Sequence, residues 1–220
     1  MLNLIGKDLS GVAFHHDILA LKGAACCLDL GDYRHSLEGK ELKLLSGKKG
    51  SFISSFSTGR ECIRLIQRNM GLPIFELISG ENGPSWPEGI IGSISHSERS
   101  AIAIVVKEIK GMGIDIERRG RVGDKVVQRI ATAEEIKKYA SASHFDWTLL
   151  FSAKESVYKA INPLERVYFG FKDVELCFDD GKKMFSTKYV GTKLGLKVID
   201  RLAGYWVEIE DQFLTLVILH

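Results

Sequence analysis

Residues 147–161 read WTLLFSAKESVYKAI, and the rest of the chain is expected to fold around them. Apolar side chains recur along this stretch at three- and four-residue spacing, which predicts a helix with one face in a core. Lys154 falls on that apolar face, where a charge needs a partner. Glu155 and Lys159 lie beside it and face each other four residues apart. The stretch therefore predicts a core helix that carries charged groups and that ends at Asn162-Pro163.

Residues 113–117, GIDIE, can supply acidic partners for this helix. They have the pattern of a strand end, so that Asp115 and Glu117 point to the same side. Together with Glu155, these side chains form a three-carboxylate corner suited to a hard divalent cation such as Mg²⁺ or Mn²⁺. The two lysines of the helix would then face the phosphate groups that such a cation binds.

Composition limits the classes of protein that fit. Of the 220 residues, 45% are hydrophobic and 26% are charged, as in an ordinary soluble globular protein. The 30 basic and 28 acidic residues give no global case for binding nucleic acid. No apolar run approaches the roughly 18 residues of a membrane helix. Cys26 and Cys27 are expected to be reduced core residues, so we expect a cytoplasmic protein without a secretion signal or a membrane partner.

A second helix is predicted from about residue 52 to residue 70, where Gly71 and Pro73 stop it. Arg60 and Arg64 lie on one face of this helix, four residues apart. A solvated helix face explains this pair as well as an anion site does. Arg60 would suit a terminal phosphate, because a guanidinium binds two phosphate oxygens at once.

Two segments with histidines also carry candidate ligands. Residues 90–97, IIGSISHS, predict a strand whose end carries Ser95 and His96. An ordinary strand-end histidine is the alternative to a ligand contact there. Residues 14–17, FHHD, contain metal-binding residue types, but surface histidines beside a loop are the favoured interpretation.

An internal similarity predicts the architecture. Residues 56–66 laid over 151–161 share Phe, Ser and Ile at equivalent positions and a basic residue at a fourth. Each helix is followed later by a hairpin that ends in an apolar strand. We therefore predict an α+β fold of two similar α+β halves, residues 1–110 and 111–220, related by a pseudo-twofold. The active site is predicted in the cleft between them, and a chain with its own cleft is expected to be a monomer.

The charged groups together are suited to a polyanion held by a metal ion. Phosphoryl transfer needs positioning and charge neutralisation more than covalent help from the protein. The sequence contains no glycine-rich Walker loop, which excludes a P-loop enzyme. On the residues alone, the carboxylates fit a metal-dependent nuclease or phosphatase equally well.

Two of these stretches also resemble a known family. GIDIE at 113–117 and FSAKESVYKA at 151–160 are similar to the paired signatures of 4′-phosphopantetheinyl transferases, in particular the enterobactin-synthase-component type within the surfactin-type group. WPEG at 86–89, GSISH at 92–96 and Gly59-Arg60 with Arg64 add to the resemblance, which covers roughly residues 50–178.

The resemblance implies a reaction. The 4′-phosphopantetheine group would move from coenzyme A to a serine of an apo acyl, peptidyl or aryl carrier protein, with Mg²⁺ present and with release of adenosine 3′,5′-bisphosphate. It implies Asp115, Glu117 and Glu155 as metal ligands, with Glu155 also the base for the serine. It implies that Lys154 and Lys159 contact the pyrophosphate.

The resemblance also implies that the two halves bind different parts of coenzyme A. Residues 1–110 would hold the 3′-phosphate end of coenzyme A through Arg60 and His96, with Arg64 and Ser95 near by. Residues 111–220 would hold the metal ion and the pyrophosphate.

Two departures leave the contacts of the adenine end open. Phe52 stands where relatives often have a basic residue, so Lys48 or Lys49 would replace it. Asn82-Gly83 stands where many have a lysine.

A metal-dependent phosphoesterase and a non-catalytic module that binds coenzyme A or a carrier are the alternatives to the transferase. The sequence does not indicate which pathway the carrier serves.

Overall fold

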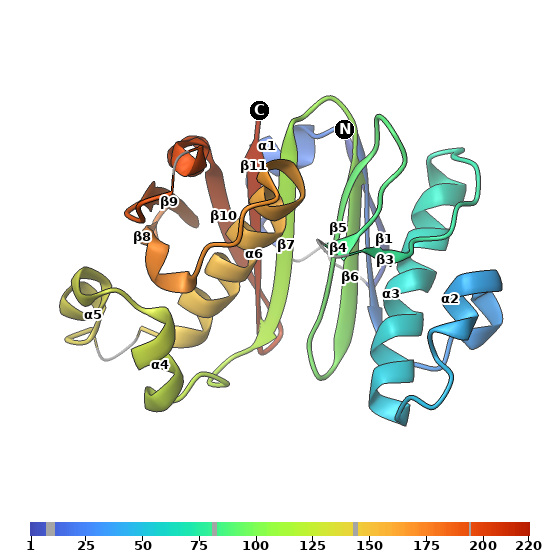
Figure 1. Cartoon of the computed structure of the whole chain (residues 1–220), viewed down its shortest axis with the longest axis horizontal. Coiled ribbons are helices and arrows are strands. Elements are labelled where there is room, and N and C mark those ends of the chain that lie inside the picture. Colours follow the sequence, from blue (N-terminus) through green and yellow to red (C-terminus); the bar gives the residue numbers. More distant parts are fainter. Residues whose placement is uncertain (8–11, 81–82, 143–144, 194) are drawn as a thin grey trace. The chain divides into compact units, whose positions relative to one another are not determined.

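The computed structural model describes residues 1–7, 12–80, 83–142, 145–193 and 195–220, and Asn82 lies outside these ranges. The chain divides into two compact units, Met1–Glu108 and Ile109–His220 (Figure 1). The sequence predicted a division after residue 110. Both units mix helices and sheet, so the fold is α+β. No helix in the described ranges has the length and apolar character needed to cross a membrane.

The first unit is a four-stranded sheet with one long helix. The strands lie in the order β1-β2-β6-β5, with β1 parallel to β2 and the other neighbours antiparallel. Their bounds are β1 Leu2–Gly6, β2 Gly23–Asp29, β5 Ile91–His96 and β6 Ser100–Val106. Helix α3, Gly50–Asn69, packs on β2 and β6. The smaller elements are α1 His16–Ala20, η1 Arg34–Ser36, α2 Gly39–Lys43, β3 Ser79–Gly80 and β4 Gly83–Pro84.

The core of this unit lies between α3 and the sheet. All residues of β6 are buried, and α3 packs on this central strand. Ile63 and Ile66 of α3 are fully buried among them. The predicted helix end is confirmed: α3 stops at Asn69, and Gly71 adopts a positive φ of 62° that glycine accommodates without strain.

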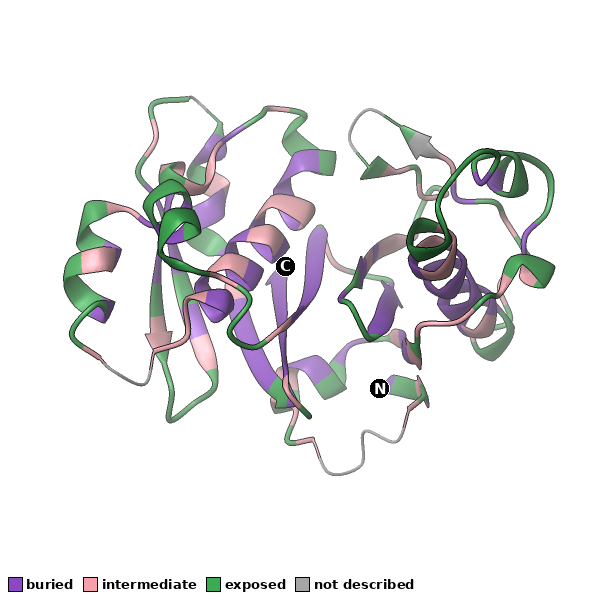
Figure 2. Cartoon of the chain, turned by 90° about the horizontal axis from the view of Figure 1, so that it is seen from below, coloured by how far each residue is buried: buried purple, intermediate pink, exposed green. Residues whose placement is uncertain are grey.

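The second unit is a five-stranded sheet with a second long helix. The strands lie in the order β7-β11-β10-β9-β8, and all neighbours are antiparallel. Their bounds are β7 Gly111–Arg118, β8 Val174–Asp179, β9 Met184–Tyr189, β10 Ala203–Ile209 and β11 Gln212–Leu219. The helical elements are α4 Asp124–Ile130, α5 Ala133–Tyr139, α6 Trp147–Glu165, η2 Phe171–Asp173 and η3 Leu196–Arg201. In Figure 2 the central strands are purple, whereas many connecting loops are green or pink.

Helix α6 contains the stretch with the charged residues and packs on β7 and β11 (Figure 1). Asp146 caps its first turn by accepting a hydrogen bond from the amide of Thr148 at 2.9 Å. The helix was predicted to end at Asn162-Pro163, and that prediction is wrong. Pro163 lies inside the last turn, and the helix continues to Glu165 before Arg166, in the left-handed conformation, caps it.

Helix α6 and strand β7 approach each other at Gly113. A Cβ atom at this position would lie 1.9 Å from the carbonyl oxygen of Ser156, so only glycine fits. Side chains alternate along a strand, so residues 115 and 117 face α6 as residue 113 does. This close contact brings the acidic residues of β7 against the charged residues of α6.

The cysteines occupy two environments. Cys26, Cys27 and Cys62 are buried and form no disulfide, so the first two lie in the core as predicted. Cys177 is free and exposed on β8.

Candidate functional site

Three carboxylates of the second unit lie on β7 and α6, which pack against each other. Asp115 and Glu117 are only 3% and 7% exposed, on the side of β7 that faces α6, and Glu155 is half-buried on α6. Burial is the largest cause of the raised pKa of both glutamates, and the negative charge of Asp115 raises it further. The structure therefore brings together the three residues predicted as metal ligands.

The pKa values of Glu117 and Glu155 are both raised, so ionisation of these carboxyl groups is unfavourable in this structure. Burial is the largest cause of the shift for Glu117, and with the charge of Asp115 it raises the pKa to about 7 against the opposing effect of Arg121. Burial also raises the pKa of Glu155, although Lys159 opposes the shift. A bound cation would stabilise the ionised form of these buried carboxylates, so the arrangement is suited to a site that holds positive charge.

Two cationic side chains supply positive charge in this structure. The ammonium of Lys159 lies 2.7 Å from Oδ1 of Asp115 and donates to the carbonyl of Ile114 at 3.2 Å. Arg121 pairs with Glu117, and its guanidinium lies 5.6 Å from the ring centre of Phe151. Lys159, predicted to contact the pyrophosphate, here pairs with Asp115. Arg121 was not assigned to the site, although it follows GIDIE by four residues.

The donor set fits a hard divalent cation that keeps water ligands. Within the described ranges, the one group whose ligand atoms all lie within 4.8 Å is His15, His16 and Asp17, so the three carboxylates are spaced more widely than that. Mg²⁺ is usually bound by one or two carboxylates, several waters and substrate phosphates, and it does not require a tight protein cage. His15 and Asp17 also interact with each other, as the N-cap of α1.

Lys154, which the sequence predicted to contact the pyrophosphate, is bound to protein groups in this structure. It is 2% exposed, and its ammonium donates to the carbonyl of Ile130, to Glu135 and to the carbonyl of Phe171 at 2.7–2.8 Å. The partner of this buried charge is therefore Glu135, and not an acid of residues 113–117. An ammonium has three hydrogens, and all three are used.

Arg60 and Arg64 also differ from both sequence interpretations, because they lie on either side of the fully buried Glu41 of α2. Nε of Arg60 is 3.2 Å from one carboxylate oxygen, and Arg64 binds the other. The two guanidiniums also donate to the carbonyls of Leu77 and Phe75 at 2.9 Å. Burial lowers the pKa of Arg60 to about 10. These arginines fasten α2 and the segment around Leu77 to α3.

The remaining candidates of the first unit lie at element ends. Lys49 is exposed and precedes the first residue of α3. Ser95 is buried in β5, and His96 is exposed as the last residue of that strand.

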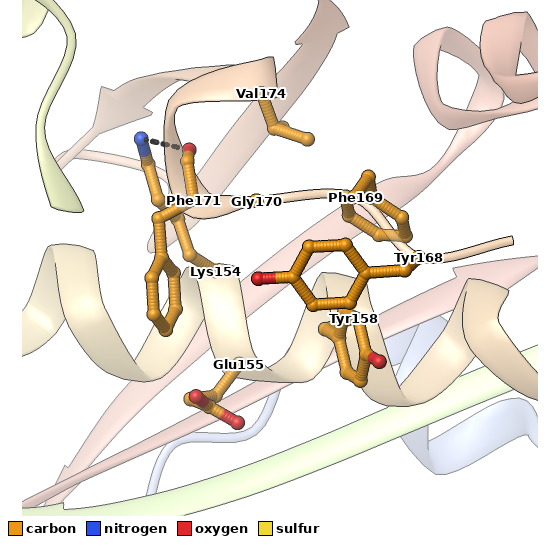
Figure 3. Close-up of a pocket in the computed structure, with 8 residues that line it drawn as sticks. All are labelled: Lys154, Glu155, Tyr158, Tyr168, Phe169, Gly170, Phe171 and Val174. Carbon is orange, nitrogen blue, oxygen red and sulfur yellow. Dashed lines mark hydrogen bonds between the residues drawn. The ribbon is translucent and has the colours of Figure 1, made fainter. Parts of the chain in front are cut away.

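A pocket beside Glu155 was not predicted from the sequence. It has a volume of about 280 Å³, and most of its lining comes from α6 and the segment that follows it (Figure 3). Its lining residues are Lys154, Glu155, Tyr158, Tyr168, Phe169, Gly170, Phe171 and Val174. The run VYFGF at 167–171 was the available signal, since it sets three aromatic residues directly after the charged helix.

Comparisons with known proteins cover most of the chain. The family profile of the 4′-phosphopantetheinyl transferase superfamily matches residues 111–206, and that of the 4′-phosphopantetheinyl transferase N-terminal domain matches residues 53–106. The chain is 32% identical over 176 residues to the 4′-phosphopantetheinyl transferase Svp of Streptomyces mobaraensis, covering 75% of this chain and 71% of that protein.

Two further relatives extend these matches. The 4′-phosphopantetheinyl transferase PptT of Mycobacterium tuberculosis is 28% identical over 193 residues, which are 82% of this chain and 85% of that protein. Enterobactin synthase component D of Salmonella typhi is 32% identical over 99 residues, which are 43% of this chain and 42% of that protein.

Proposed function

This chain belongs to the 4′-phosphopantetheinyl transferase superfamily, and on that premise we propose that Asp115, Glu117 and Glu155 form its metal-binding and catalytic centre. The chain is an enzyme that transfers the 4′-phosphopantetheine group from coenzyme A to a serine of an apo carrier protein, releasing adenosine 3′,5′-bisphosphate. The observation that supports our assignment of the centre is the convergence of three carboxylates on the contact between β7 and α6, with the pKa of two of them raised.

The proposed cation is Mg²⁺, with Mn²⁺ as the alternative hard ion. When bound, it would neutralise the pyrophosphate of coenzyme A. The three carboxylates would hold it together with water and phosphate oxygens. Lys159, 27% exposed and already directed at Asp115, is placed to offset the charge that develops on the leaving phosphate.

Glu155 is the proposed base for the carrier serine. Its carboxylate would take the proton from the serine hydroxyl, directly or through a water, as the serine oxygen attacks the phosphorus that bears the pantetheine arm. The bond from that phosphorus to the bridging pyrophosphate oxygen breaks, and adenosine 3′,5′-bisphosphate leaves. Burial raises the pKa of Glu155, which makes its carboxylate a better proton acceptor than an exposed glutamate.

The pocket beside Glu155 is the proposed site for the pantetheine arm. The arm is a long chain whose amides alternate with methyl and methylene groups, and the pocket offers aromatic rings to these groups, among them Tyr158 and Tyr168 at 6.3 Å between centres (Figure 3). Aromatic walls with few polar groups are typical of such sites. An arm bound there ends at the phosphorus next to Glu155.

In the first unit, Lys49, Ser95 and His96 are the proposed contacts for the 3′-phosphate of coenzyme A. Arg60 and Arg64 are given a supporting role, since Glu41 already holds both. We further propose that the two units repeat one plan, because each packs a long helix on a sheet: α3 on β2 and β6, and α6 on β7 and β11.

The chain is proposed to act as a monomer in the cytoplasm, where thiols such as those of the buried Cys26 and Cys27 stay reduced. The relative named for enterobactin synthesis makes a siderophore carrier a suitable first acceptor, beside fatty-acid and polyketide carriers.

The test is incubation with coenzyme A, Mg²⁺ and apo carrier proteins, followed by mass spectrometry of the carrier. We expect the phosphopantetheine mass on the wild-type reaction, and turnover about 10²–10⁴-fold lower for Asp115→Asn and Glu155→Gln. Glu134→Gln, at an exposed carboxylate of the same unit, is the matched control with unchanged turnover. Release of nucleotide without an acceptor would indicate a phosphoesterase, and normal rates in both variants would exclude the proposed centre.

A further inference from the structure

We propose that Lys154 is a positioning residue that holds the wall of the pocket beside Glu155, and that it does not contact the pyrophosphate. The inference rests on the proposed function, because it takes that pocket as the site of the pantetheine arm. Its basis is the burial of Lys154 and the set of partners that its ammonium already has.

The partners of Lys154 come from three other segments. Ile130 is the last residue of α4, Glu135 lies in the first turn of α5, and Phe171 begins η2. A single ammonium therefore ties α6 to α4, α5 and η2. To reach a phosphate, it would have to break three hydrogen bonds and leave the carboxylate of Glu135 buried without its counter-charge.

Glu135 is itself fully engaged. The carboxylate oxygen that accepts from Lys154 also accepts from the amide of Thr132 at 2.8 Å, which is half of a capping box. The other oxygen accepts from the amide of Leu176 in β8 at 2.8 Å. Glu135 thus links Lys154 to β8, because it binds the amide of the third residue of that strand.

The contact with Phe171 transmits this network to the pocket. Figure 3 shows the ammonium of Lys154 bonded to the carbonyl of Phe171, with Gly170 and Phe169 next along the pocket wall. Val174, which begins β8, lines the same pocket. The backbone on which the pocket residues are mounted is therefore fixed at Phe171 by Lys154 and near Val174 by Glu135.

This geometry predicts which step Lys154 affects. Loss of its ammonium should disturb the fit of the pantetheine arm, so that the KM for coenzyme A rises. It should leave recognition of the phosphates unchanged, because that belongs to Lys159 and the metal ligands. Replacing both members of the buried pair should be less harmful than replacing one, since no unpaired charge then remains.

The experiment compares Lys154→Met with Lys159→Met and with the double variant Lys154→Met/Glu135→Gln, using inorganic pyrophosphate with Mg²⁺ as a competitor of coenzyme A. For Lys154→Met we expect the KM for coenzyme A to rise about tenfold and the Ki of pyrophosphate to stay within about twofold of wild type. For Lys159→Met we expect the Ki to rise about tenfold. The double variant should recover KM and melting temperature relative to Lys154→Met.

Hydrogen exchange of residues 170–176 gives a readout that does not depend on turnover. Exchange of the Leu176 amide should accelerate in Lys154→Met and stay unchanged in Lys159→Met. A Ki that rises in Lys154→Met as it does in Lys159→Met, or unchanged exchange at Leu176, overturns the inference. If the wild-type chain transfers nothing to carriers, the proposed function fails, while the exchange data still decide whether Lys154 holds this segment.

Discussion

Replacing Gly113 by alanine tests whether the contact between β7 and α6 builds the site. The added Cβ atom would lie 1.9 Å from the carbonyl oxygen of Ser156 and 2.7 Å from the amide nitrogen of Ala160. Both atoms belong to the backbone of α6, so no side-chain rotation relieves the overlap. Ordinary contact requires a displacement of the helix by about 1.5 Å.

That displacement acts on stability and on chemistry at once. Overpacking of this kind costs about 1–3 kcal/mol, and each kcal/mol lowers the melting temperature of a unit of this size by about 4–8 °C. Because α6 carries Glu155 and Lys159, the 2.7 Å contact between Lys159 and Asp115 would be lost. A shift of about 1 Å at reacting groups lowers turnover by about a hundredfold.

The assays are thermal denaturation and transfer of phosphopantetheine to an apo carrier protein. Gly181→Ala is the matched control, because its Cβ would make only an ordinary 3.5 Å contact with Asp179 in an exposed hairpin. We expect wild-type melting and turnover for the control and large losses in both for Gly113→Ala. A Gly113→Ala protein that melts and turns over like the control would refute the reasoning.

Three further predictions follow from the charged clusters. Burial raises the pKa of Glu117 to about 7, so without metal its contribution to stability is present at low pH and is lost as pH rises through about 7. The melting temperature should therefore fall as pH rises towards 7. Glu117→Gln should reduce this dependence of the melting temperature on pH. Arg121→Gln should tighten binding of Mn²⁺ to the free protein by up to about fivefold in calorimetry, since a half-exposed counter-charge is removed. Glu41→Gln should cost about 3–5 kcal/mol in thermal denaturation, because two arginines lose their buried carboxylate.

Each of these has a comparison that can contradict it. Added Mg²⁺ should remove the pH slope attributed to Glu117, and a slope that survives both metal and substitution has another origin. Weaker Mn²⁺ binding in Arg121→Gln would show that the arginine supports the site. Glu38→Gln, at an exposed residue just before α2, should melt like wild type, and an equal loss there would remove the special role of Glu41.

The sequence predicted the framework of the site well, because that framework is local. Helical periodicity identified α6, and alternation in GIDIE placed Asp115 and Glu117 on one side of β7. Positions four residues apart on a helix, such as Glu155 and Lys159, have a fixed relation whatever the fold. Proline position was a weaker guide, since a proline in the last turn leaves the rest of the helix in place, as at Pro163.

The contacts that the sequence did not reveal involve partners from distant segments. Arg60 and Lys154 were assigned to phosphates because guanidinium and ammonium groups suit anions. Their acids, Glu41 and Glu135, lie 19 residues away along the chain in both cases and reach them only through tertiary packing. Thr132 and Glu135 have the sequence pattern of a capping box, but the hydrogen bond from Lys154 to Glu135 cannot be inferred from the sequence.

Cys177 offers a practical consequence. Within the described ranges it is the one exposed cysteine, and it follows Leu176, whose amide binds Glu135. A maleimide dye would therefore attach to a single position without engineering of the other thiols. Its emission would follow the start of β8 in real time, so that filling of the neighbouring pocket becomes a fluorescence signal in the unmodified sequence.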